Sequence, residues 1–92
     1  MKKVAVVILN YNGRKFLEQF LPNLIANCDP AISEVIVAEN ASTDDSVTFM
    51  REHFPSIRLI INGSNGGFAT GYNLALRQIE AEYFVLLNSD IE

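Results

Sequence analysis

Short apolar runs alternate along the chain with longer segments in which apolar residues recur at helical spacing. Four runs rich in aliphatic and β-branched residues predict strands over residues 4–9, 34–38, 57–61 and 83–87. The first run, from Val4 to Leu9, has no polar residue, which is typical of a strand buried on both faces of a parallel sheet.

Between the strands lie three segments with an apolar stripe, which predicts three helices. The first stripe covers residues 16–25, and Pro22 inside it predicts a kink or a restart because proline lacks a backbone N–H. The third stripe covers residues 68–79.

The second helix has recognisable start and stop signals. Ser42 or Thr43 is the expected N-cap, which would place Asp44 and Asp45 in the first turn, where negative charge is favourable. Pro55 ends the segment.

The order of these elements, βαβαβαβ with short connections, indicates an α/β fold: a Rossmann-like, doubly wound, mostly parallel sheet with right-handed crossovers. The chain has 92 residues, of which 49% are hydrophobic and 20% charged, so residues 1–92 are expected to form one globular unit.

The charge balance limits the possible ligands. With 7 Lys and Arg against 11 Asp and Glu, the net charge of -4 argues against a nucleic-acid partner. A phosphate ligand would have to be neutralised by a metal ion or by backbone amides. Cys28 is the single cysteine, and no stretch is long enough to cross a membrane. The predicted location is the cytoplasm, with attachment to the inner face of a membrane left open.

Asparagine follows every predicted strand, at Asn10, Asn40, Asn62 and Asn88. Asparagine is common in turns, which accounts for part of this pattern. The same loops nevertheless contain further polar residues and glycines, and ligands of such sheets bind outside the carboxyl ends of the strands. The loops therefore predict a binding site that includes Tyr11, Asn12, Glu39, Ser42, Asp44, Asn65, Gly66, Gly67 and Asp90.

Several of these residues suit a nucleotide, although the glycine loop of dinucleotide-binding folds and the Walker lysine motif are absent. Tyr11 can stack on a base, and Glu39 can accept hydrogen bonds from a ribose hydroxyl or a base N–H. An ordinary loop tyrosine and a solvated acid are the competing interpretations. Asn88, Asp90 and Glu92 would share one side of an extended segment and offer hard oxygen ligands for Mg²⁺ or Mn²⁺.

Taken together, these residues resemble the nucleotide-binding half of the inverting family-2 glycosyltransferases, which have the GT-A fold. Four segments carry the resemblance, in this order: residues 7–13 (Val-Ile-Leu-Asn-Tyr-Asn-Gly), 35–44 (Val-Ile-Val-Ala-Glu-Asn-Ala-Ser-Thr-Asp), 65–73 (Asn-Gly-Gly-Phe-Ala-Thr-Gly-Tyr-Asn) and 84–90 (Phe-Val-Leu-Leu-Asn-Ser-Asp). The third segment is most similar to members that transfer rhamnose and related sugars onto bacterial polysaccharides.

The resemblance implies roles for matching positions. Asn10 and Tyr11 would border the base, and Glu39, where family members usually have aspartate, would contact the uracil or ribose. Asp90 matches the metal-binding carboxylate of the Asp-x-Asp motif, whose first aspartate is replaced by Asn88. The remaining implied residues are Asn12, Asn40, Ser42, Asp44, Asn65, Gly67 and Gly71 for the nucleotide sugar, and Glu92 for the metal.

The implied reaction uses a UDP- or dTDP-sugar donor and transfers the sugar with inversion to a saccharide or lipid-linked acceptor. In the family the general base lies well beyond the metal motif, so no catalytic residue is assigned to this chain. We expect the chain to be the amino-terminal half of a longer enzyme, truncated after Glu92 and inactive by itself.

The family's usual strand order, 3-2-1-4, would leave the fourth strand at an exposed apolar edge, which predicts a homo-oligomer. Two other functions stay open at this point. One is a nucleotidyltransferase-like enzyme, and the other is a degenerate, non-catalytic module for nucleotide binding or assembly.

Overall fold

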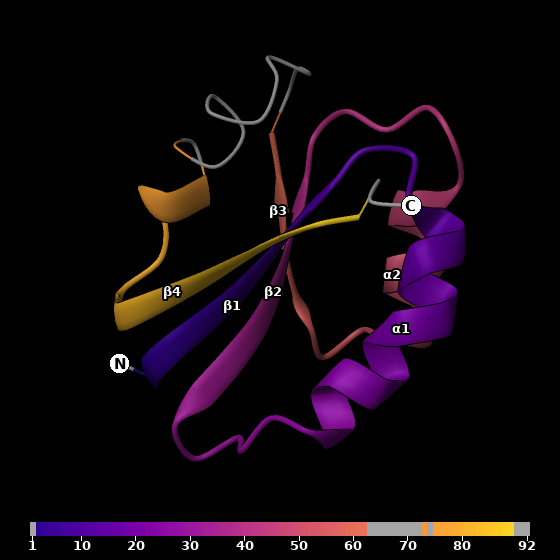
Figure 1. The fold of residues 1–92 in the computed structure, drawn as a ribbon. Helices are drawn as coiled ribbons and strands as arrows, with labels where there is room; N and C mark the ends of the chain where they lie inside the picture. The colour runs from indigo at the N-terminus through magenta and orange to yellow at the C-terminus, as the bar shows by residue number, and fades with distance from the viewer. Residues whose placement is uncertain (1, 63–72, 74, 90–92) are drawn as a thin grey trace.

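The computed structural model describes residues 2–62, 73 and 75–89, which form a four-stranded sheet with helices packed against it (Figure 1). The strands are β1 (Lys2–Asn10), β2 (Ser33–Glu39), β3 (Arg58–Ile61) and β4 (Ala81–Asn88). The helices are α1 (Arg14–Ala26) and α2 (Ser46–His53). All four predicted strands are present.

The strands lie in the order β3-β2-β1-β4 and every neighbouring pair is parallel. In register, Val6 of β1 lies opposite Val35 of β2 and Val85 of β4. The predicted α/β class and strand order are confirmed. Because β1 has a neighbour on each side and packing on both faces, its continuous apolar run is buried from residue 5 onwards.

Alternate residues of each strand supply two separate cores, as the period of two in a strand requires. The core that α1 and α2 cover is built from buried side chains of two strands and two helices: Val6, Ile8, Leu17, Leu21, Val35, Val37, Phe49 and Met50. The core on the opposite face contains Ala5, Val7, Leu9, Ile36, Ala38, Ile60, Ala75 and Ile79. The sheet is therefore covered on both faces, with α1 and α2 together on one of them (Figure 1).

Helix α1 continues through Pro22 to Ala26, so the predicted restart does not occur. Pro22 is exposed, whereas Leu17 and Leu21 are fully buried. Burying such a side chain contributes about 1.5–3 kcal/mol, which offsets the roughly 3 kcal/mol cost of a proline within a helix.

Helix α2 begins later than the sequence predicts. Its N-cap position is Asp45, and the carboxylate of Asp44 accepts a hydrogen bond from the backbone N–H of Ser46 at 3.0 Å. Ser42 and Thr43 do not cap the helix, because both contact Asn12 instead. The two aspartates thus precede the first turn, and the helix ends before Pro55 as expected.

Most of the predicted third helix lies outside the described residues. Within it, Asn73, Ala75 and Leu76 are helical, and the backbone N–H of Arg77 donates to the carbonyl of Asn73 at 3.3 Å. Ala75 and Ile79 are buried in the core opposite α1. Neither of the two complete helices among the described residues is long and apolar enough to cross a membrane.

Candidate functional site

The carboxyl ends of β1, β2 and β4 meet at one edge of the sheet, which is the upper edge in Figure 1. Backbone hydrogen bonds extend the pairing just past the strands: the N–H of Asn40 donates to the carbonyl of Asn10 at 2.8 Å, and the N–H of Ser89 donates to that of Leu9 at 3.0 Å. The loops that follow the three strands therefore start at fixed positions relative to one another.

Asn10 stands at the centre of this edge and has no exposed surface. Its amide nitrogen donates to the Glu39 carboxylate at 2.7 Å and to the Ser42 hydroxyl at 3.3 Å. Its amide oxygen accepts from the Gly13 N–H at 3.1 Å and from the Ser89 hydroxyl at 2.7 Å. One side chain thus joins the loops after β1, β2 and β4, and the four contacts fix the orientation of its amide.

Glu39 is 1% exposed and is held on both carboxylate oxygens. Oε2 accepts the hydrogen bond from Asn10, and Oε1 accepts one from the backbone N–H of Ser42 at 2.9 Å. The chain returns toward the carboxylate through Ala41, whose φ of 60° lies in the left-handed region that alanine rarely adopts. Burying a carboxylate costs less free energy when each of its oxygens accepts a hydrogen bond. The hydrogen bond from Ser42 therefore holds the β2–α2 loop against Glu39.

Asn12 organises the outer part of the same loop. Its φ of 54° is left-handed, a conformation that asparagine tolerates. Its side-chain oxygen accepts hydrogen bonds from the backbone N–H groups of Thr43 at 2.7 Å and Asp44 at 3.1 Å, and its own N–H donates to the Ser42 hydroxyl at 2.9 Å. The loops after β1 and β2 therefore form one connected unit.

The beginnings of the two helices belong to this unit as well. The carboxylate of Asp44 accepts hydrogen bonds from the hydroxyl of Ser46 and from the backbone N–H of Arg14, the latter at 3.2 Å. The guanidinium of Arg14 lies 4.9 Å from the centre of the Phe49 ring and 3.1 Å from the Glu18 carboxylate. Arg14 thus ties α1 to α2.

Gly13 has no room for a side chain. A Cβ at this position would lie 2.3 Å from the Ser89 hydroxyl and 2.5 Å from the amide oxygen of Asn10. Gly13→Ala is therefore expected to lower the free energy of unfolding by about 1–3 kcal/mol, measured by urea titration. Gln19→Ala, at an exposed position of α1, is the control and should change it by less than about 0.5 kcal/mol. Equal effects of the two alanines would contradict the close packing.

The candidate residues divide into buried and accessible groups. Asn10, Glu39 and Asn40 are buried, and the Asn40 amide oxygen accepts from Asn62 at 3.4 Å. Tyr11, Asn12 and Asp44 are exposed, while Ser42 and Asn88 are half-buried. The remaining candidates lie outside the described residues: Asn65, Gly66, Gly67, Gly71, Asp90 and Glu92. The structure thus places an accessible rim above a buried network of hydrogen bonds.

Two members of the network have roles that the sequence analysis did not assign. Ser89 is 3% exposed and links β4 to Asn10, and Gly13 supplies the close approach that makes this contact possible. In the sequence, the only indication of these roles was that Ser89 follows Asn88 and Gly13 follows Asn12, two predicted site residues.

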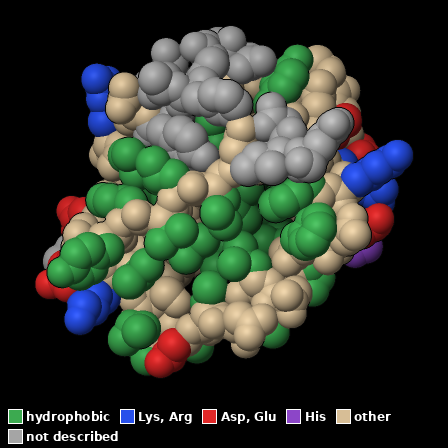
Figure 2. All heavy atoms as spheres, in the orientation of Figure 1, with side chains coloured by type: hydrophobic (Ala, Val, Ile, Leu, Met, Phe, Trp, Pro, Cys, Tyr) green, Lys and Arg blue, Asp and Glu red, His purple; other side chains and the backbone are tan. Residues whose placement is uncertain are grey.

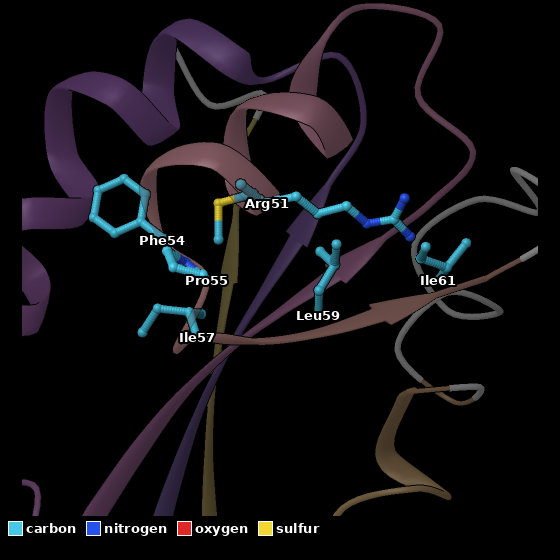
Figure 3. Close-up of a pocket in the computed structure, with 7 residues that line it drawn as sticks. Arg51, Phe54, Pro55, Ile57, Leu59 and Ile61 are labelled. Atoms are coloured by element: carbon cyan, nitrogen blue, oxygen red, sulfur yellow. The ribbon is translucent and has the colours of Figure 1, made fainter.

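An apolar cavity of about 230 Å³ lies elsewhere, between α2 and β3 (Figure 3). Arg51 is the one charged side chain in its lining, which otherwise consists of Met50, Phe54, Pro55, Ile57, Leu59 and Ile61. Such a lining offers few partners for the hydroxyls and phosphates of a nucleotide. The polar edge is therefore the better candidate for a nucleotide site.

Comparison with known proteins identifies relatives over nearly the whole chain. The pattern of the Glycosyl transferase family 2 matches residues 5–92. The chain is 32% identical over 76 residues to the N-acetylglucosaminyl-diphospho-decaprenol L-rhamnosyltransferase of Mycobacterium tuberculosis, a match that covers 83% of this chain and 24% of that protein. It is 28% identical over 94 residues to the poly(ribitol-phosphate) beta-N-acetylglucosaminyltransferase TarS of Staphylococcus aureus, covering 98% of this chain and 16% of TarS.

Solved structures agree with these matches. The mannosyltransferase PcManGT of Pyrobaculum calidifontis, solved with GDP-Man and Mn²⁺, superposes with a TM-score of 0.81 at 29% identity, over 96% of this chain and 27% of that one. Residues 1–349 of TarS, solved with UDP-GlcNAc, superpose with a TM-score of 0.78 at 27% identity, over 96% of this chain and 26% of that one. The chain thus spans less than a third of each of these relatives.

Proposed function

The chain belongs to the Glycosyl transferase family 2, and we propose that it binds the nucleoside diphosphate part of a sugar donor at the edge where β1, β2 and β4 end. One observation carries this proposal. The buried amide of Asn10 joins the loops after three strands through four side-chain hydrogen bonds. A rim fixed in this way before the ligand arrives loses little conformational freedom on binding.

We assign the binding of the donor's nucleobase to Tyr11. This side chain is 37% exposed at the rim, directly after the fixed Asn10, so its ring is accessible for stacking. We propose a uridine or thymidine diphosphate sugar as the donor. The likeness to TarS, a protein solved with UDP-GlcNAc, supports the pyrimidine.

In this proposal the main role of Glu39 is to hold the loops of the nucleoside site in place through its hydrogen bonds to Asn10 and Ser42. Each carboxylate oxygen accepts one internal hydrogen bond, which leaves a lone pair on each for a ribose hydroxyl or a base N–H. Its 1% exposure means that a ligand would reach it from one side only. Asn12, Ser42 and Asp44 shape the accessible wall beside it.

The diphosphate needs a positive partner because the chain has a net charge of -4. We assign a divalent ion, Mg²⁺ or Mn²⁺, to Asp90 with Asn88 and Glu92, since carboxylate and amide oxygens are the ligands such ions prefer. PcManGT, which resembles this chain, was solved with Mn²⁺. When bound, the ion would neutralise charge on the departing nucleoside diphosphate. The buried Ser89 holds the start of this segment to Asn10 at 2.7 Å.

For the whole protein we propose transfer of the sugar, with inversion, to a saccharide or lipid-linked acceptor. The rhamnosyltransferase and TarS, whose names refer to a diphospho-decaprenol and a poly(ribitol-phosphate), support this acceptor class. The general base is assigned to sequence beyond these 92 residues, so we expect the chain to bind the donor without transferring the sugar.

Calorimetric titration of UDP, dTDP and GDP into the chain with Mn²⁺ tests the donor site. UDP or dTDP is expected to bind saturably, with weaker binding after EDTA is added. Tyr11→Ala should weaken binding by about 5- to 150-fold, the equivalent of roughly 1–3 kcal/mol of stacking. Asp90→Ala should remove the effect of EDTA.

Phe20→Ala is the matched control because Phe20 is an exposed aromatic residue of α1 that lies outside the proposed site. It should bind UDP as tightly as the unaltered chain. The proposal fails if none of the three nucleotides binds to a chain that is folded by circular dichroism, or if Tyr11→Ala and Phe20→Ala have the same effect.

A further inference from the structure

We propose that Ser89 is a positioning residue for the metal ion of the donor: its buried hydroxyl sets the path by which the chain leaves β4 and enters the segment that contains Asp90. Through Asn10 it also ties this path to the nucleoside side of the site. The inference rests on the proposed function, because it takes Asp90 as a ligand of the ion. It adds that binding of the ion depends on a side chain whose own hydrogen bond goes to the protein.

Ser89 is held at the end of β4 in two directions. Its backbone N–H donates to the carbonyl of Leu9 at 3.0 Å, and its hydroxyl donates to the amide oxygen of Asn10 at 2.7 Å. Two consecutive residues of β1 thus anchor the first residue after β4. Asp90 lies outside the described residues, but a trans peptide bond places its Cα about 3.8 Å from that of Ser89. A shift of Ser89 would therefore be passed on to Asp90.

The Ser89 side chain is enclosed as well as hydrogen-bonded. It is 3% exposed, and a Cβ at Gly13 would lie 2.3 Å from its Oγ and 2.7 Å from its Cβ. The Gly13 N–H donates at 3.1 Å to the same Asn10 oxygen that accepts from Ser89, so two donors use both lone pairs of this oxygen. The position of the hydroxyl is therefore set by the fold before any ligand binds.

The opposite end of the Asn10 amide faces the nucleoside side of the site. Its nitrogen donates to the Glu39 carboxylate at 2.7 Å and to the Ser42 hydroxyl at 3.3 Å. Because the amide is planar, its oxygen and its nitrogen cannot move independently. The contact between Ser89 and Asn10 thus fixes the end of β4 relative to the loop after β2, and these are two separate parts of the donor site.

The charge of the chain makes the position of the ion important. The net charge is -4, and the Lys and Arg side chains on the face drawn in Figure 2 lie at separate places along its outline. The described part of this face therefore offers no basic patch that could hold a diphosphate in place of a metal ion. Removing an outer partner of a metal site typically lowers metal affinity by about 10- to 100-fold, and we expect loss of the Ser89 hydroxyl to act in the same way.

A merely structural role for Ser89 predicts a different result. Loss of a buried hydrogen bond would then loosen the whole edge and weaken UDP binding by the same factor with and without metal. In a positioning role, the contact between Asn10 and Glu39 survives the loss of the hydroxyl, because it uses the amide nitrogen. Metal-free binding of UDP is then nearly unchanged, and only the gain in affinity from Mn²⁺ is reduced.

Calorimetric titration of UDP with EDTA and with Mn²⁺ gives two dissociation constants for each variant, and their ratio is the gain from the ion. Ser89→Ala is expected to keep the EDTA value within about twofold of the unaltered chain and to lower the ratio by about 10-fold or more. Ser33→Ala is the matched control, because its hydroxyl donates to the carbonyl of Asp29 at 2.7 Å at the opposite end of β2. It should change neither constant.

Ser42→Ala should give the reverse pattern. The Ser42 hydroxyl accepts from the amide nitrogen of Asn10 and from the backbone N–H of Asn12, both on the nucleoside side. This variant should weaken UDP binding by a similar factor in EDTA and in Mn²⁺, which leaves the ratio unchanged.

The outcomes separate the role of Ser89 from the proposed function. An unaltered chain that does not bind UDP, or that binds it equally with EDTA and with Mn²⁺, would overturn both. A gain from Mn²⁺ that Ser89→Ala retains in full would overturn the role of Ser89 alone. The same holds for a Ser89→Ala chain that loses UDP binding in EDTA as well.

Discussion

Glu39→Gln is expected to lower the free energy of unfolding by about 2–4 kcal/mol, although the two side chains have nearly the same shape. The carboxylate accepts hydrogen bonds on both oxygens, from the Asn10 amide at 2.7 Å and from the Ser42 N–H at 2.9 Å. A glutamine has a single side-chain oxygen, so its NH₂ group must face one of these two donors. Asn10 cannot turn its amide to compensate, because its oxygen already accepts from Gly13 and Ser89.

Urea titration followed by circular dichroism measures this effect. Glu34→Gln is the matched control: it is the same substitution in the same strand, at a half-buried position at the other end of β2. It is expected to change the free energy of unfolding by less than about 0.5 kcal/mol. If the two variants were equally stable, the buried carboxylate would have no special part in holding the edge.

Asn10→Asp is expected to be more damaging, at about 3–5 kcal/mol near neutral pH. It places a second carboxylate against Glu39, at a position with no exposed surface. It also removes the NH₂ group that donates to Glu39 and Ser42. Two carboxylates in contact repel each other strongly away from water.

Urea titration of the variant and the unaltered chain near neutral pH measures this loss of stability. Asn23→Asp is the control, because Asn23 is exposed on α1 and uses its side-chain oxygen as an acceptor for Asn27. An Asn10→Asp variant as stable as Asn23→Asp would show that the edge tolerates a second buried charge.

The residues at the carboxyl edge of the sheet show which features of the site could be predicted from the sequence and which could not. The run of asparagines marked the edge correctly, since Asn10, Asn40 and Asn62 are all buried there. The sequence could not show that Asn10 contacts loops 29 to 79 residues away. Such contacts depend on which strands are neighbours in the sheet, and a local sequence pattern does not specify strand pairing. The proposed roles of Tyr11 and Asp90 in ligand binding stay predictions, and Asp90 lies outside the described residues.

The start of α2 shows the same limit on a smaller scale. Ser42 and Thr43 are good N-cap residues, and nothing nearby in the sequence excluded them. The oxygen of Asn12 accepts from the N–H and hydroxyl groups of Thr43 at 2.7 and 3.3 Å, so this segment is drawn toward the loop after β1. Asp44 and Asp45 take the positions ahead of the helix instead.

The sequence by itself determined the four strands, the two complete helices and the α/β class. The spacing of apolar residues that distinguishes strands from helices is a property of residues close together in the sequence. With the family resemblance it also identified the edge at which ligands are expected. Only the tertiary structure decided that Asn10 and Glu39 form a buried centre beneath an accessible rim. Burial and hydrogen bonding depend on residues that come together only when the parallel strands assemble.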